Sequence, residues 1–341
     1  MPKRQQTGQP CCGPCGTAKR SRQPPAPQQH VYLVVDDWER GYSVRKLDVG
    51  AFDDSDAAST NTDEVAEPLP EPPVVRFAGR HCDLWNFGGH GSNILAMPVS
   101  SDADSGFPMF DTSKLGLSLC AHPGGQKPPD NDVDKSTRWS WTLAEAPMKS
   151  SHVVSTASHP DGRTLFVSGF TDEGKSTFAL DTESLGWTCQ GSWVMPFRDQ
   201  AYFDEGLDAW VGLCRFKGGV GHVCSCDVPA VAAAKRGGTM PAWKLGKDRL
   251  FDADGERHLG ATLLHLGSSD YCLIENLLHR DFNPYDRCRG PTRRVLYVTR
   301  FGLKYDKDGD LRTTRLRARS YEMTEGHEFN DPCNAPVAFW M

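Results

Sequence analysis

The sequence has no long apolar run and almost no segment with helical periodicity. No apolar stretch approaches the length of about 18 residues that a membrane-spanning helix requires, so no such helix is expected. Only the alanine-rich patch at 231–235 favours a turn of helix, within a loop. A nucleophile elbow, a phosphate-binding glycine loop and an H-E-x-x-H helix are also missing, so we predict no catalytic, cofactor-binding or metal-ligating residues.

The net charge and the cysteines further limit the possible partners and cellular location of the protein. The formal net charge of −6 gives no reason to expect nucleic acid or an anionic membrane as a partner. No apolar stretch follows the basic residues near the N-terminus, so we expect no conventional secretory signal and a cytoplasmic or nuclear location. In these compartments the 12 cysteines stay reduced and act as small apolar residues.

Residues 1–29 are predicted to form a disordered basic tail. The tail has no acidic residue and is rich in Gln, Pro and Gly, so it cannot bury enough apolar surface to offset the entropy of ordering. Its Lys-Arg pairs at 3–4 and 19–20 resemble a bipartite nuclear-import signal, although such pairs also occur on tails of other kinds. Cys12 and Cys15 have thioredoxin spacing, but no strand precedes them and no helix follows, so we interpret the motif as a coincidence.

The stretch at 153–197 carries the strongest structural signal. Four short apolar runs alternate with Pro-Asp-Gly, Asp-Glu-Gly and Glu-Ser-Leu-Gly turns, a pattern typical of antiparallel strands. Four strands within about 45 residues, with an aromatic residue in the last strand, match one blade of a β-propeller. We therefore predict a four-stranded blade here, with Trp187 packed between this blade and a neighbour.

Similar strand patterns on both sides predict a single domain over 30–341, an all-β, kelch-like β-propeller of five to six four-stranded antiparallel blades. An acidic surface loop interrupts the pattern at 50–73, and a segment rich in Gly, Pro and charge leaves one blade, at about 121–148, degenerate. Outside the central stretch, strands are expected at 32–35, 42–49, 74–77, 82–87, 93–99, 107–120, 139–143, 200–203, 209–214, 222–228, 243–251, 260–266, 271–275, 294–303 and 311–321.

The segment at 335–340 follows turn residues and has the pattern of one more strand. The N-terminal unit lacks one strand, and an unclosed propeller would expose two sheet edges. We hypothesise that this segment pairs with the N-terminal unit and joins the first and last blades. The alternative is a frayed terminus.

Internal repetition supports the blade pattern. Residues 110–117 and 180–187 share Asp, Thr, Leu and Gly in register, and Asp48 and Asp227 mark weaker copies of the same strand end. An Asp that closes a strand can accept hydrogen bonds from the amides of the next turn. We therefore interpret Asp181 and its counterparts as structural residues rather than ligands.

One expected strand is the strongest candidate for a metal site. His222, Cys224 and Cys226 alternate and so share a face, and imidazole and thiolate are ordinary zinc ligands. However, the expected hairpin would pair Cys224 with Leu213 and Cys226 with Val211, which makes the face apolar. We interpret the cysteines as core residues, with His222 at the edge of the face.

A calcium loop is the second metal motif considered. Asp306, Asp308 and Asp310 alternate, but Gly309 stands two places early, and Arg317 occupies the position where the loop needs a bidentate acid. We therefore predict a hairpin turn.

A basic edge follows this turn. It consists of Arg312, Arg315, Arg317 and Arg319, and the last three alternate on one strand face. Charge often guards a strand edge against unwanted pairing, and no exposed aromatics are interleaved. We therefore interpret these arginines as residues that protect a strand edge, rather than as an anion-binding or RNA-binding site.

Several segments resemble a known family. The segments that carry the resemblance are FALDTESLGW, RDQAYFDEGLDAWVGL, GHVCSCDVP, PAWKLGKDRLF and ERHLGATLLHLG. They are similar to those of a plant-specific group known only as domain of unknown function 1668, which itself resembles kelch propellers. The similarity covers most of 31–323 and is strongest at 152–266. It implies a propeller fold and brings no activity, catalytic residue or cofactor, while the weakened segment at 121–136 departs from a regular blade count.

These patterns favour a non-catalytic propeller scaffold or protein-interaction module with an unknown protein partner. Long loops on a rigid ring are where recognition usually occurs. Such loops are expected at 50–73, 121–136, 229–241 and 279–292. One alternative is an enzyme with a small-molecule site at the propeller mouth. Another is a substrate-recognition adaptor for ubiquitin ligation, which is weakened because the tail is too short and polar for an additional helical adaptor domain.

Overall fold

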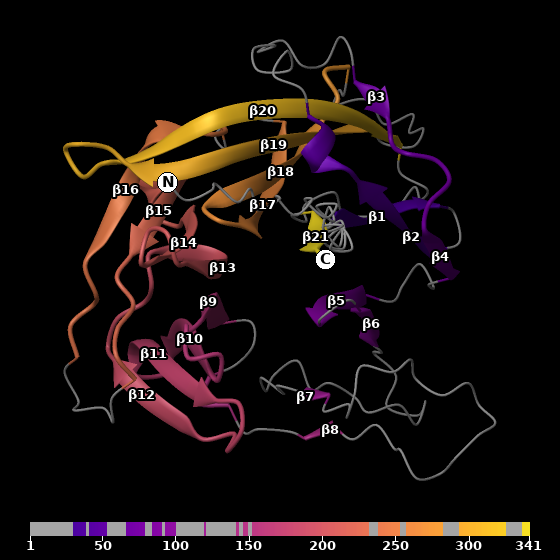
Figure 1. Ribbon diagram of the computed structural model, residues 1–341. Coiled ribbons are helices and arrows are strands. Elements are labelled where there is room, and N and C mark those ends of the chain that lie inside the picture. The colour runs from indigo at the N-terminus through magenta and orange to yellow at the C-terminus, as the bar shows by residue number, and fades with distance from the viewer. Residues whose placement is uncertain are drawn as a thin grey trace, which may run out of the picture.

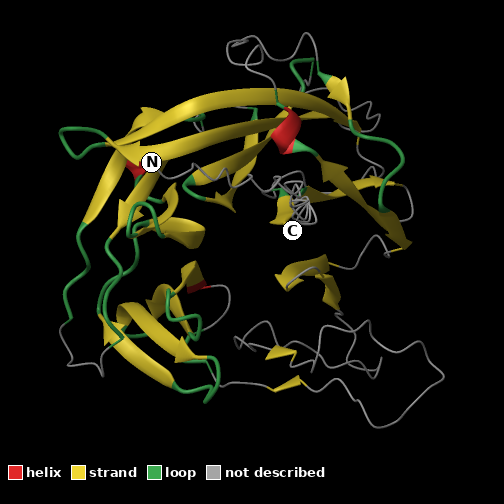
Figure 2. Ribbon diagram, viewed as in Figure 1, coloured by secondary structure: helices red, strands yellow, loops and turns green. Residues whose placement is uncertain are grey.

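The described part of the chain is almost entirely β-structure. The computed structural model describes residues 30–38, 41–52, 66–78, 84–90, 93–99, 119–120, 141–142, 146–148, 152–231, 238–252, 257–281, 293–324 and 336–341. Helix in these residues is limited to short 3-10 turns such as η1 (Val49–Ala51) and η4 (Lys217–Gly219) (Figure 2). The all-β prediction is confirmed. Within the same residues, no helix has the length and apolar character needed to cross a membrane.

The stretch at 153–197 folds into four sequential antiparallel strands, as predicted. They are β9 (Val153–Ser158), β10 (Thr164–Thr171), β11 (Gly174–Asp181) and β12 (Trp187–Gly191). Phe166 and Val167 point to opposite faces of β10 and are both buried, so this sheet is covered on both sides.

A second set of four antiparallel strands follows directly. It comprises β13 (Phe197–Asp204), β14 (Ala209–Cys214), β15 (His222–Cys226) and β16 (Trp243–Arg249). The first strands of the two sets, β9 and β13, pair in parallel where Gln200 lies opposite Thr156. The two sets therefore form one sheet in the order β12-β11-β10-β9-β13-β14-β15-β16.

A third set forms the longest sheet. Its strands are β17 (His258–Gly267), β18 (Asp270–Leu278), β19 (Arg293–Tyr305) and β20 (Leu311–Thr324). The short strand β3 (Glu67–Pro68) pairs in parallel with the outer edge of β20, where Tyr321 lies opposite Glu67. A segment from the N-terminal part of the chain thus covers a short part of this edge.

The two ends of the described chain meet in a fourth sheet, in the order β21-β1-β2-β4. Its strands are β21 (Val337–Trp340), β1 (Val31–Trp38), β2 (Gly41–Leu47) and β4 (Val75–Ala78). Val34 lies opposite Val337, and His30 and Met341 exchange backbone hydrogen bonds of 2.8 and 3.1 Å. The predicted pairing of 335–340 with the N-terminal unit is confirmed.

A buried arginine holds the N-terminal sheet to its own loop. The side chain of Arg45, on β2, is 5% exposed and forms an ion pair with Asp37 of β1. It also donates to Ser43 Oγ at 3.2 Å and to the Pro70 carbonyl at 2.8 Å. A charge that is buried with several hydrogen-bond partners can stay ionised in the interior.

The remaining described strands form two separate pairs. They are β5 (Leu84–His90) with β6 (Asn93–Val99), and β7 (Leu119–Cys120) with β8 (Trp141–Thr142). The strand expected at 82–87 extends further, to His90, because Gly88 and Gly89 continue the ladder opposite Leu95 and Ile94. Most of the segment expected to be degenerate, at 121–148, lies outside the described residues.

The cores lie between successive sets of strands. One core joins the β9–β12 and β13–β16 sets through Phe166, Phe197 and Trp210, and another joins β13–β16 to β17–β20 through Tyr271 and Phe301. The third joins β17–β20 to the N-terminal sheet. Figure 1 shows these sheets following one another around a common centre, with β9, β13, β17 and β21 nearest to it and β12, β16, β20 and β4 outside.

The structure corrects the placement of Trp187. This residue lies on the outer strand β12, is only half-buried, and contacts Phe178 edge-on with the ring centroids 6.5 Å apart. A fully buried tryptophan between the two sets of strands is Trp210, on β14. The error arose because a propeller blade was expected to carry its interface aromatic in the last strand, whereas here β14 carries it.

Candidate functional site

An exposed aromatic cluster joins residues of the β9–β12 and β13–β16 sets. Phe170, Phe216 and Trp243 are 39%, 38% and 36% exposed, which is unusual for large apolar side chains that lie together. The rings of Phe216 and Trp243 stack with their centroids 5.1 Å apart. The guanidinium carbon of Arg215 lies 5.9 Å from the Phe170 centroid and 5.5 Å from that of Phe216. We call these four residues the aromatic patch.

Glycine positions the loop that carries half of the patch. A Cβ atom at Gly219 would lie 2.4 Å from Cys214 Sγ and 2.7 Å from Leu245 Cδ1, so only glycine lets this loop lie against β14 and β16. The Arg215 amide donates to the Pro196 carbonyl at 3.0 Å, which fixes the start of the loop. The patch is therefore presented by a loop that is packed onto a sheet.

The charges around the patch are asymmetric. Lys217 follows Phe216 in the loop and is exposed, and Lys175 is the cross-strand partner of Phe170. The acidic residues Asp172 and Glu173 lie in the adjoining turn between β10 and β11. A partner that carries a carboxylate would therefore approach from the side of Arg215 and Lys217, where it meets positive charge.

A cavity of about 250 Å³ lies where the inner strands β13, β17 and β21 meet. Two hydrogen bonds fix its walls: Tyr202 Oη donates to the Leu263 carbonyl at 3.0 Å, and Thr262 Oγ1 donates to the Pro336 carbonyl at 2.6 Å. Burial raises the pKa of Tyr202 well above its usual range, so this hydroxyl stays protonated.

The acidic residue of this cavity has a shifted pKa. Partial removal from water raises the pKa of Asp199, and the positive charge of the neighbouring Arg198 acts in the opposite direction. Ionised Asp199 is thus less stable here than in open solution. A cationic group placed beside the ionised carboxylate of Asp199 would be stabilised by its negative charge.

The predicted cysteine face is core, but with a different register. Cys224 lies opposite Gly212 and Cys226 opposite Trp210, one position from the expected pairing, because Arg215 belongs to the loop and not to the hairpin. Both cysteines are fully buried against Phe197 and its neighbours, so the interpretation as core residues is confirmed.

The side chains of these cysteines and of His222 interact with other groups of the protein. Cys224 Sγ donates to the Pro196 carbonyl at 3.6 Å. The adjacent Cys224 side chain is the largest cause that lowers the pKa of Cys214, to about 7. His222 Nδ1 lies 2.9 Å from the Gly246 carbonyl. Across the described ranges, no three His, Cys, Asp or Glu side chains come close enough together to bind a metal ion.

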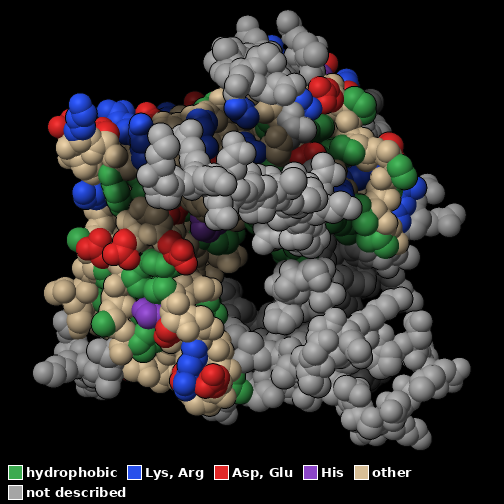
Figure 3. All heavy atoms as spheres, viewed as in Figure 1, with side chains coloured by type: hydrophobic (Ala, Val, Ile, Leu, Met, Phe, Trp, Pro, Cys, Tyr) green, Lys and Arg blue, Asp and Glu red, His purple; other side chains and the backbone are tan. Residues whose placement is uncertain are grey.

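The predicted basic edge connects neighbouring sheets. Arg312 forms ion pairs with Asp306 and Asp248, at 3.2 and 3.4 Å. Arg315 pairs with Asp270. Lys and Arg side chains are concentrated over β19 and β20 in Figure 3, and acidic side chains gather below them. These two arginines are therefore compensated by carboxylates within the protein.

The last two arginines contact the N-terminal sheet through Phe52. Arg317 donates to the Phe52 carbonyl at 3.0 Å, and the Arg319 guanidinium lies 5.1 Å from the Phe52 ring centroid. The predicted common face is wrong for Arg315, because a bulge at this residue, with φ of 51°, breaks the alternation before Arg317. β3 pairs with the edge of β20 at Tyr321 and Glu322, beyond the four arginines.

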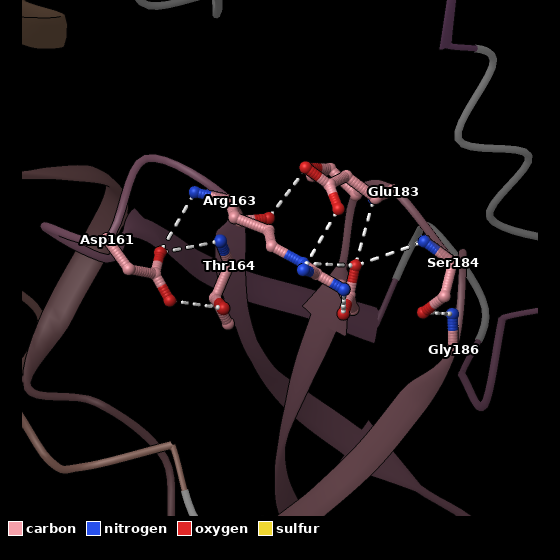
Figure 4. Close-up of polar contacts among 8 residues, drawn as sticks. Asp161, Arg163, Thr164, Glu183, Ser184 and Gly186 are labelled. Atoms are coloured by element: carbon pink, nitrogen blue, oxygen red, sulfur yellow. Dashed lines mark hydrogen bonds and ion pairs between the residues drawn. The ribbon is translucent and has the colours of Figure 1, made fainter.

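Two of the recurring Asp residues, Asp181 and Asp48, cap turns, as expected. Asp181 Oδ1 accepts hydrogen bonds from the amides of Glu183 and Ser184 at 2.9 and 3.0 Å (Figure 4). Arg163 reaches across from the preceding turn and donates to the same carboxylate at 2.9 Å, which keeps the pKa of Asp181 well below its usual range. Asp48 plays the same role for the Gly50 amide, at 3.0 Å.

The segment considered as a calcium loop is the predicted hairpin turn. Asp306 Oδ1 accepts from the amides of Asp308 and Asp310, at 3.0 and 2.9 Å. Several other predictions lie outside the described residues: the basic tail at 1–29 with its import pairs and Cys12 and Cys15, the repeat at 110–117, and most of the acidic loop.

The described strands define an all-β protein built from successive antiparallel sheets, with an aromatic patch on its surface and a cavity at the inner strands. A family model described as "Protein of unknown function (DUF1668)" matches residues 28–131 and 118–321. The chain belongs to this family, which confirms the family named from the sequence. No curated protein and no solved structure matches the chain significantly.

The sequence analysis predicted neither the aromatic patch nor the cavity. Phe216 stands in a loop and Phe170 at a strand end, and no spacing rule brings them to one arginine. The strand expected at 200–203 takes in only the last residue of the polar run Arg198-Asp199-Gln200. Its only signal was three consecutive polar residues between Phe197 and Ala201, where a regular strand would alternate.

Proposed function

We propose that the chain is a kelch-like β-propeller that acts as a non-catalytic protein-interaction module. Three complete sets of strands and the pairing of β21 with β1 support a ring of five blades, with β5 to β8 forming the fifth. A core between each described pair of neighbouring sets supports this arrangement. In such a ring the rigid blades present the loops, and recognition occurs at the loops.

The aromatic patch is the observation that carries the proposal. Exposed aromatic rings next to an arginine are typical of interaction hot spots, because they offer large contact areas at low conformational-entropy cost. The stacked rings of Phe216 and Trp243 suit an apolar or aromatic side chain. Arg215 and Lys217 suit a carboxylate. The proposed partner is therefore a protein segment that combines an apolar side chain with an adjacent acidic residue.

Proximity labelling in cells tests the proposal with a matched control. The labelled proteins are compared for the wild-type chain, for the double variant Phe216→Ser/Trp243→Ser, and for Leu316→Ser. Leu316 is 40% exposed on β20 and outside the patch, so its variant controls for the loss of exposed apolar surface.

A reproducible partner that is lost in the double variant and retained in Leu316→Ser would support the proposal. A partner set that is the same for all three proteins would contradict the role of the patch. Thermal denaturation of the purified variants checks that each remains folded.

A further inference from the structure

Three consecutive side chains of the inner strand β13 are exposed. Phe197 and Ala201 are buried, whereas Arg198, Asp199 and Gln200 between them are all exposed and line the cavity. A regular strand would send every second side chain to the opposite face. The local backbone must therefore depart from a regular strand.

The departure is a bulge centred on Asp199. Its φ of 60° lies in the left-handed region, and the pairing with β14 slips between Arg198, opposite Leu213, and Tyr202, opposite Val211. Bulges re-aim side chains and are enriched beside functional sites. A left-handed conformation at a residue other than glycine costs free energy, which makes it an indicator of function when the surrounding structure enforces it.

Gly212 makes the bulge possible. A Cβ atom at this position would lie 2.8 Å from Phe197 Cδ1 and 3.2 Å from Ala201 Cβ. The space left by the missing side chain lets Phe197 and Ala201 close beneath the bulge. The polar run and the glycine on the adjacent strand thus encode one local structure.

The three polar side chains have unused bonding capacity. Among the described residues, the side chains of Arg198, Asp199 and Gln200 form no hydrogen bond or ion pair. A cation, a carboxylate and an amide therefore face the same space. The opposite wall, on β17 and β21, is largely apolar and includes Leu263, Val337 and Phe339.

The size and lining of the cavity define its occupant. A volume of 250 Å³ holds about eight water molecules, or one molecule of the size of a small amino acid. We infer that the cavity is a binding site for a small amphipathic zwitterion of the aliphatic α-amino acid class. Arg198 binds the carboxylate, Asp199 binds the ammonium group, Gln200 bonds to either, and the apolar wall receives the aliphatic chain. This site is independent of the aromatic patch.

Isothermal titration calorimetry with the full chain tests the inference. The probes are L-leucine, L-valine, 4-methylpentanoate, which lacks the ammonium group of leucine, and 3-methylbutylamine, which lacks its carboxylate. We expect L-leucine or L-valine to bind, and both analogues to bind at least about tenfold more weakly than L-leucine, because each loses one charge-assisted contact. Absence of binding by both amino acids, or equal binding of the analogues, would overturn the inference.

Two variants test which residue binds each charged group of the ligand. Arg198→Gln and Asp199→Asn are each expected to weaken amino-acid binding at least about tenfold. Asp199→Asn should leave the weak binding of 4-methylpentanoate unchanged, because this analogue has no ammonium group. Arg163→Gln, at an exposed turn, is the matched control and should bind like the wild type. Because Arg198 and Asp199 are exposed, both variants are expected to fold, which circular dichroism checks. Binding that is unaffected by either variant would place the ligand elsewhere and overturn the assignment.

Discussion

The indole Nε1 of Trp210 donates a hydrogen bond of 2.8 Å to the backbone carbonyl of Ser158, and so ties β14 to the end of β9. The same indole lies edge-on against Phe166, with the ring centroids 4.9 Å apart. Trp210 has no exposed surface. One side chain therefore provides apolar burial, an aromatic contact and a polar bond across the junction of two sets of strands.

Trp210→Ala is expected to cost about 3 to 5 kcal/mol of unfolding free energy, since it removes a fully buried aromatic side chain and leaves a cavity. Trp187→Ala should cost clearly less, because Trp187 is half-buried on an outer strand. Chemical denaturation of the two variants measures the difference. Equal losses would show that the β9–β12 and β13–β16 sets do not meet at Trp210.

Tyr271→Phe should destabilise the contact between the β13–β16 and β17–β20 sets. The Tyr271 hydroxyl donates to Asp204 Oδ2 at 2.8 Å, and Asp204 is completely buried. Loss of a hydrogen bond to such a group costs about 1.5 to 3 kcal/mol. Tyr305→Phe is the control, since its hydroxyl donates only to Ser225 Oγ, and it should cost about 1 kcal/mol. A smaller loss for Tyr271→Phe than for Tyr305→Phe, measured by denaturation in urea, would contradict this expectation.

Removal of residues 335–341 should leave the edge of β1 without its partner strand. We expect aggregation or a large loss of stability, because an open edge pairs readily with other chains. Removal of residues 1–28 is the matched truncation and is expected to leave stability unchanged. Light scattering and thermal denaturation measure both effects. An unchanged, monomeric protein after the C-terminal truncation would show that β21 contributes little.

Asp199→Asn should raise stability at neutral pH. Because folding raises the pKa of Asp199, the folded chain binds this proton more tightly than the unfolded chain does, and stability falls as pH rises from the unfolded pKa of about 3.9 through the folded value. Asparagine removes that loss and tolerates the left-handed conformation, with a gain below about 1 kcal/mol since the site is exposed beside Arg198. Melting temperatures of the two proteins should differ at pH 7 and converge at about pH 3. A variant that is less stable at pH 7 would refute the argument.

The fold class was predictable because strand patterns are local. Alternation and turn residues placed the four strands of 153–197, and Asp181 was correctly read as a cap because its partners lie within the next few residues. The terminal strand was found by a different argument, that one unit lacked a strand. Each of these inferences depends on short-range sequence or on the need to pair an edge.

The errors concern contacts between distant segments. The register at Cys224 was wrong by one because a single loop residue, Arg215, decides it. Trp187 and Trp210 carry similar local patterns, and only packing distinguishes them. The bulge at Asp199 depends on Gly212 of the neighbouring strand, and the aromatic patch depends on a loop that folds back over β16. Local rules contain no information on such pairings.

The pairing of β1 with β21 has a consequence for biosynthesis. Val34 and Val337 are about 300 positions apart, so at a synthesis rate of about 5 to 20 residues per second the first strand exists for tens of seconds before its partner is made. During that interval β1 can rely on β2 and β4, and the contacts of Arg45 with Asp37 and Pro70 lie entirely within the residues already made. The N-terminal sheet is thus assembled in two stages. Its last strand, β21, is added only after residues 337–340 have been synthesised.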